Sequence, residues 1–135
     1  MIDYFDPVLS NLDLYWTGLL RSLGICLWAM VGSLALGTVI AAFRVSPVPS
    51  LQAFGTAWVT IWRNCPLSVV LFFMAFGLPE IGINASFYLL GVTGLVIYTS
   101  AFVCEALRSG INAVQAGQAE AARAIGLTFT QSLGQ

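Results

Sequence analysis

The charged residues of the chain are few and widely spaced, and they divide it into long neutral intervals. No charge lies between Arg21 and Arg44, an interval of 22 residues. As a helix this interval would be about 33 Å long, enough to cross the roughly 30 Å hydrocarbon core of a bilayer. Two further apolar stretches follow it. The pattern predicts three transmembrane helices, at about 20–43, 51–78 and 85–106.

Small residues recur along the first neutral interval. They are Gly24, Gly32, Ser33, Gly37 and Ala41. Residues of this size at four- or five-residue spacing allow a second helix to approach closely. Glycine is also common in membrane helices generally, so the pattern permits either interpretation.

The middle stretch contains the polar cluster Arg63-Asn64-Cys65-Pro66. Pro66 removes one backbone donor and clashes with the preceding turn, so a kink or break is expected there. One kinked span is the favoured interpretation, and the alternative is a surface helix followed by a short one. Proline-rich and glycine-rich connectors at 45–50 and 77–82 predict the turns on either side.

The composition excludes an ordinary soluble domain and most enzymes. Hydrophobic residues make up 59% and charged residues 8% of the chain, and there is no histidine. Common zinc sites, a Ser-His-Asp triad and a Cys-His pair are therefore excluded. A net charge of -1 offers no basic field to nucleic acid. Cys26, Cys65 and Cys104 have no paired spacing, which favours small buried hydrophobic residues over disulfides or ligands.

The distribution of arginines predicts the orientation. Arg108 and Arg123 follow the third span, whereas the hairpin at 79–84 has no basic residue. Cytoplasmic loops are enriched in basic residues, so the end of the third span is expected inside and the N-terminus outside. An acidic segment before the first span is unlike a secretory signal.

The chain changes character after Cys104, where it becomes helical in pattern and rich in small residues. Ala116, Ala119, Ala122 and Ile125 recur every three residues and form a narrow apolar face. The segment 115–135 is therefore expected to contact another protein. A solvated alanine-rich helix that connects to further spans is the alternative.

Four sequence blocks carry a resemblance to a known family. Glu120-Ala121-Ala122 followed by Gly126 resembles the cytoplasmic EAA signature of the inner-membrane permease subunits of ABC importers. The polar amino acid branch, and actinobacterial glutamate permeases in particular, are similar over the segments 44–48, 63–67, 105–111 and 117–127.

The resemblance implies an all-α, polytopic membrane helical bundle with three transmembrane helices and a cytoplasmic coupling helix, which is the front part of a five-helix permease. It implies a subunit without catalytic residues, cofactor or metal. The expected partners are cytoplasmic ATPase subunits, a second permease subunit and an extracytoplasmic amino acid binding protein. The residues expected to couple to the ATPase are Gly117, Glu120, Ala121, Ala122 and Gly126.

Arg63 is an ionisable residue at membrane depth, where charges usually face a bundle interior or an aqueous cavity. Its guanidinium could bind a substrate carboxylate, helped by donors from Asn64. Alternatively, Arg63 reaches an interface or bonds a helix carbonyl. Glu105 is expected to act locally, either as a cap or in a pair with Arg108 three residues further along, and not as part of a proton relay.

Family members usually continue beyond the coupling region into two more spans, whereas this chain stops at Gln135. The leading hypothesis is a permease subunit of an ATP-driven importer of polar amino acids, with glutamate favoured. A small non-transporting membrane scaffold or an inactive permease fragment is the alternative. A secondary transporter is disfavoured because the spans lack a relay of acidic or histidine residues beyond Glu105.

Overall fold

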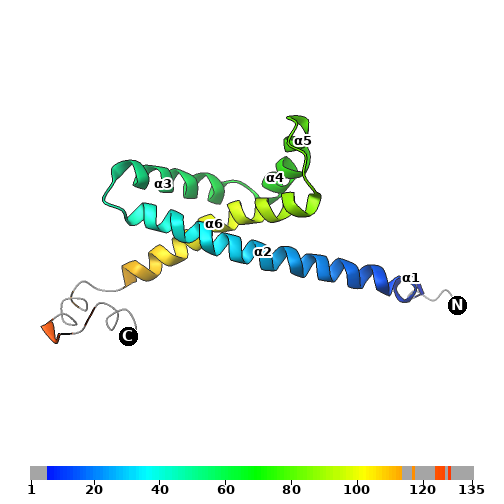
Figure 1. Cartoon of the computed structure of the whole chain (residues 1–135), viewed down its shortest axis with the longest axis horizontal. Coiled ribbons are helices and arrows are strands. Elements are labelled where there is room, and N and C mark those ends of the chain that lie inside the picture. Colours follow the sequence, from blue (N-terminus) through cyan, green and yellow to red (C-terminus); the bar gives the residue numbers. More distant parts are fainter. Residues whose placement is uncertain (1–5, 114–116, 118–123, 127, 129–135) are drawn as a thin grey trace.

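The computed structural model describes residues 6–113, 117, 124–126 and 128, and the elements in this part of the chain are helices (Figure 1). They are α1 Asp6–Leu9, α2 Leu12–Val45, α3 Pro49–Asn64, α4 Leu67–Phe72, the π-helix η1 Phe73–Gly77, α5 Leu78–Glu80 and α6 Phe87–Ala113. Among the described residues, α2 and α6 are each long and apolar enough to cross a membrane.

Helix α2 is longer than the predicted 20–43. It has 34 residues, about 51 Å, and its N-terminal part extends beyond α3 and α6 (Figure 1). The segment before Arg21 contains no proline after Leu12 to end the helix. The helix ends at Val45 because Ser46 precedes Pro47 and is extended, with φ -65° and ψ 146°.

Helices α2 and α6 pack side by side and run in the same direction. A Cβ atom added at Gly24 would lie 2.7 Å from the Tyr88 hydroxyl oxygen, and one at Gly32 would lie 2.6 Å from Val96 Cγ2. The residue numbers of the contacting positions therefore increase together along the two helices, as they do only when the helices are parallel. The small residues predicted to allow close approach are confirmed as the face of α2 that meets α6.

The main core lies where α2, α3 and α6 meet. Its buried residues are Ile40, Ala41, Val59, Ala101 and Cys104, and aromatic side chains of α2 and α3 pack against them. The indole Nε1 of Trp58 donates a hydrogen bond to Ser100 Oγ at 3.1 Å, which satisfies both polar groups inside the helix contact. This core fixes α3 across both longer helices.

The middle stretch is broken, not merely kinked. Helix α3 ends at Asn64, Cys65 is extended, and the segment Leu67–Glu80 turns away by 97°. Pro66 lacks the N–H that would continue the helix and disfavours a helical residue before it. Neither α3 nor the following segment passes as a span by itself, although the two together do.

The second connector begins later than its glycine and proline content suggested. The helical segment continues through Gly77 and Pro79 to Glu80, partly as the π-helix. The chain then turns at Ile81 and Gly82, and Gly82 has φ +85°, a conformation that favours glycine. The glycine and proline residues of the sequence predicted that the connector begins at residue 77, about four residues before the observed turn at Ile81.

The cysteines are free and occupy three different environments. Cys104 is buried, Cys65 is half-buried and Cys26 is exposed. The prediction that all three are small buried residues is therefore wrong for Cys26. Its position on the outer face of α2 has large exposed apolar neighbours such as Leu23 and Leu27. On a face covered by lipid, hydrophobicity does not drive a side chain into the protein.

Candidate functional site

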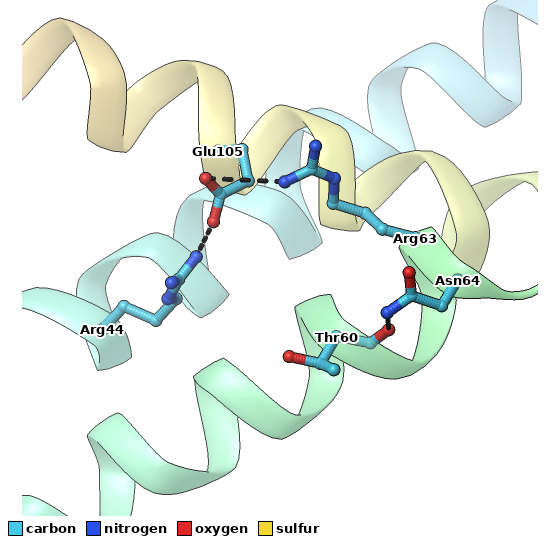
Figure 2. A network of polar contacts seen from close by, with 5 residues as sticks. All are labelled: Arg44, Thr60, Arg63, Asn64 and Glu105. Atoms are coloured by element: carbon cyan, nitrogen blue, oxygen red, sulfur yellow. Dashed lines mark hydrogen bonds and ion pairs between the residues drawn. The ribbon is translucent and has the colours of Figure 1, made fainter.

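Three charged side chains from three helices meet at one end of the core (Figure 2). Arg44 lies in the last turn of α2, Arg63 lies in the last turn of α3, and Glu105 lies on α6. The Arg44 Nη1 group donates a hydrogen bond to Glu105 Oε1, and Arg63 Nη1 lies 3.7 Å from Glu105 Oε2. We call these three residues the charge cluster.

Local structure favours the two arginines at these positions. The last turn of a helix carries partial negative charge from its free carbonyl groups, and a cation stabilises it. Gly55 of α3 leaves room for Arg44, since a Cβ atom there would lie 2.6 Å from Arg44 Cγ. The short loop between α2 and α3 thus brings a glycine against the aliphatic part of the arginine.

The expected local pair of Glu105 with Arg108 is wrong. Glu105 pairs instead with Arg44 and Arg63, which lie on other helices. Its position on α6 directs it toward the contact with α2 and α3, where the neighbouring Cys104 is fully buried. An intrahelical pair at spacing three contributes only a few tenths of a kcal/mol, so partners supplied by tertiary packing prevail.

The side chains of Arg63 and Asn64 differ in how many of their hydrogen-bond donors are already used within the protein. The Arg63 side chain is 48% exposed, and its guanidinium carbon lies 5.8 Å from the centre of the Phe102 ring. The Asn64 side chain donates from Nδ2 to the Thr60 carbonyl oxygen at 2.7 Å. Arg63 therefore keeps donors available, whereas Asn64 uses a donor to complete the end of α3.

The charge cluster borders a polar cavity of about 460 Å³. Its lining residues are Arg44, Val59, Thr60, Arg63, Asn64 and Glu105. Two guanidinium groups face one carboxylate, so one positive charge is left over. An arginine beside a cavity of this size can bind a carboxylate through paired N–H donors. Among the described residues, no group of His, Cys, Asp or Glu could hold a metal ion.

The coupling residues are only partly within the described residues. Gly117 and Gly126 are exposed, whereas Glu120, Ala121 and Ala122 lie outside the described part of the chain. Gly126 has φ +79° and lies in a turn next to Ile125, which is 76% exposed. The backbone therefore turns at Gly126, in a conformation that favours glycine.

Residues 33–134 match the sequence pattern of the family described as the binding-protein-dependent transport system inner membrane component. The chain belongs to this family. It is 42% identical to the glutamate transport system permease protein of Corynebacterium efficiens, over 90% of this chain and 57% of that protein. It is 40% identical to the probable glutamine ABC transporter permease protein of Bacillus subtilis, over 92% of this chain and 57% of that protein.

A solved structure of a relative has the same fold. The crystal structure of an amino acid ABC transporter with histidines superimposes with a TM-score of 0.86 at 31% identity, and the match covers 98% of this chain and 62% of that one. This inner membrane component thus spans about three fifths of the length of the relatives it matches. Its exposed apolar helices fit a location in the membrane.

Sequence reasoning found Arg63 but missed the rest of the charge cluster. Arg44 was interpreted as the end of the first span and as part of the 44–48 segment, and Glu105 was paired within its own helix. Each residue directly follows a long neutral interval, and the first and third predicted spans would run in the same direction. That shared end was a usable signal, because opposite charges at the same depth of a membrane protein tend to pair.

Proposed function

We propose that this chain is a membrane-spanning permease subunit of an ATP-driven, binding-protein-dependent importer of polar amino acids, with glutamate as the favoured substrate. The observation that carries the proposal is the identity of 40–42% with glutamine and glutamate permeases over about nine tenths of the chain. ATP hydrolysis would belong to separate cytoplasmic ATPase subunits. An extracytoplasmic binding protein would deliver the amino acid, and a second permease subunit would complete the path.

The topology we propose has three crossings, with the N-terminus outside and residues 115–135 in the cytoplasm. The parallel packing of α2 and α6 supports the three crossings, and the arginines that follow the third span support the orientation. If both helices cross in the same direction, the segment between them must return across the bilayer. Helix α3 has 16 residues, about 24 Å, so it would cover most of the roughly 30 Å depth of the return path.

We assign ATPase contact to Gly117, Glu120, Ala121, Ala122 and Gly126. Support comes from the family match, which includes these positions, and from the position of the segment directly after α6 in the sequence. The turn at Gly126 would let the segment reverse direction against a partner. Movement of the ATPase subunits would then act on α6 and, through it, on the core.

We place Arg63 and Asn64 in the substrate path. The support is geometric, because both residues line the polar cavity beside the charge cluster and Arg63 is half-exposed. A guanidinium with free donors suits the carboxylate groups that every amino acid carries. The excess positive charge of the cluster would favour an acidic amino acid over a basic one.

Uptake by living cells tests the proposed function. Deletion of the gene in its source organism is expected to abolish the part of radiolabelled glutamate uptake that depends on ATP, and a plasmid copy should restore it. Collapse of the ion gradients with ATP maintained should leave that uptake intact. Unchanged uptake after deletion would support a scaffold instead, and loss of uptake with the ion gradients would support a secondary transporter.

Gly126→Ala is expected to weaken coupling. Alanine in the left-handed conformation costs about 1–2 kcal/mol, so the turn would be populated roughly five- to thirtyfold less. The measurement is substrate-stimulated ATPase activity of the purified transporter. Gly91→Ala is the matched control, because Gly91 also has open space around it, has no positive φ and lies outside the coupling residues. Equal ATPase activity in the two variants would contradict a role for this turn.

A further inference from the structure

Glu105 shares its two carboxylate oxygens unequally between the two arginines of the charge cluster. Oε1 accepts a hydrogen bond from Arg44, whereas Oε2 lies 3.7 Å from the nearest Arg63 nitrogen. The second separation is longer than the 2.7–3.2 Å of a hydrogen bond, although it is still an ion pair. Glu105 is therefore held firmly by one arginine and loosely by the other (Figure 2).

The two arginines also differ in their freedom to move. The Arg44 side chain is 11% exposed and packs over Gly55, whereas the Arg63 side chain is 48% exposed and borders the cavity. Any exchange of partners would therefore occur at Arg63. A carboxylate that enters the cavity would meet the one guanidinium of the cluster that is not already bound by a hydrogen bond to Glu105.

We infer that Glu105 is a displaceable counter-ion of Arg63. It holds the Arg63 guanidinium while the cavity is empty, and it gives way when the carboxylate of an acidic amino acid binds there. This inference rests on the proposed function of Arg63 in the substrate path. Glu105 is thus a positioning residue that acts on the substrate through Arg63, and Arg44 keeps it in place during the exchange.

The location of Glu105 connects this exchange to the coupling segment. Glu105 lies on α6 eight residues before the end of the helix at Ala113, about 12 Å along its axis. Arg63 lies on α3. A shift of α6 relative to α3 changes the separation between Glu105 and Arg63, which is already at the limit of an ion pair. Motion from the ATPase side would therefore alter how strongly Glu105 competes with substrate.

If Glu105 competes with the substrate, its replacement should lower the dissociation constant for an acidic amino acid, which is the opposite of what loss of a supporting residue would do. A partly exposed ion pair contributes up to about 1 kcal/mol, which corresponds to about a fivefold change in a dissociation constant. Removal of the competitor should therefore tighten the binding of an acidic amino acid. If Glu105 only supported the structure, its replacement would weaken binding or leave it unchanged.

The double variant Arg44→Gln with Glu105→Gln isolates this effect. It removes one positive and one negative charge, so the charge cluster keeps its single excess positive charge while Arg63 loses its counter-ion. Paired neutral amides at this position are expected to be tolerated, because both charges are removed together. The probe is radiolabelled glutamate, and the measurement is its Kd for the purified membrane complex without the binding protein.

We expect the double variant to bind glutamate about two- to fivefold more tightly than the wild type. Glu105→Asp keeps the charge but shortens the side chain by one methylene, which should weaken most the contact with Arg63 that is already 3.7 Å long, so it should shift the Kd in the same direction by a smaller factor. Arg63→Gln should remove saturable binding. Arg108→Gln, which changes the charge of α6 outside the cluster, should bind as the wild type does.

The outcomes separate this inference from the proposed function. An unchanged or weaker Kd in both Glu105 variants, together with lost binding in Arg63→Gln, would overturn the role of Glu105 and leave Arg63 as the substrate contact. Normal binding by Arg63→Gln would also overturn it, because Glu105 acts through that residue. Absence of glutamate uptake by wild-type cells would instead refute the proposed function.

Discussion

Gly37→Ala is expected to push α6 away from α2 and to lower the thermal stability of the protein. A Cβ atom at this position would lie 2.6 Å from two atoms of Val103 and 2.9 Å from the Ser100 carbonyl oxygen. The carbonyl belongs to the backbone, so rotation of a side chain cannot relieve the contact. Overpacking of this kind typically costs about 1–3 kcal/mol. The measurement is thermal unfolding in detergent, followed by circular dichroism.

Gly91→Ala is the matched control for this prediction. Gly91 also lies inside a helix, but a Cβ atom there would have no neighbour within 4 Å. Both variants gain about 1 kcal/mol in helix propensity over glycine, so the difference between them reports the clash alone. If Gly37→Ala proved as stable as Gly91→Ala, the close parallel contact of α2 and α6 would be wrong.

Arg44→Gln should also destabilise the protein substantially. The substitution leaves Glu105 with only its loose contact to Arg63, although the Glu105 side chain is 31% exposed. The loss of one partner costs about 3–5 kcal/mol in a fully buried pair and about 0–1 kcal/mol at a surface. For this partly buried pair we expect about 2 kcal/mol, measured by the same thermal unfolding.

A second substitution distinguishes charge from packing in this result. Glu105→Gln added to Arg44→Gln removes the unpaired carboxylate and should recover most of the lost stability. A double variant no more stable than the single one would show that Arg44 contributes through its aliphatic contacts with Gly55. Arg108→Gln, which removes an arginine outside the charge cluster, should have an effect within about 0.5 kcal/mol.

The positions of the two long helices could be predicted from the sequence because lipid compatibility is a local property. A run of about 20 apolar residues is long enough to cross a bilayer wherever it occurs, and the intervals before Arg44 and before Glu105 contain most of α2 and most of α6. The face of α2 that contacts α6 could also be predicted from its small residues, since Gly32 and Gly37 permit the close approach of α6.

The course of the middle segment was only half predictable. Pro66 predicts a break in the helix because it lacks a backbone donor. The proline alone does not set the 97° angle between α3 and the segment Leu67–Glu80. Packing of the second part on α6 contributes to that angle, since Gly94 lets Leu71 and Met74 approach to within 3.1–3.2 Å of where its Cβ atom would lie. A contact of this kind depends on the positions of both partners in space.

The sequence by itself determined that this is a helical membrane protein of the permease family, where its long helices lie, and that Arg63 is an ionisable residue at membrane depth. Only the tertiary structure decided that Arg63 and Arg44 share Glu105 as their partner. Glu105 is 61 residues from Arg44, and no spacing rule relates the two. They meet because α2 and α6 run in parallel over a face of small residues, which places the end of one span beside the end of the other.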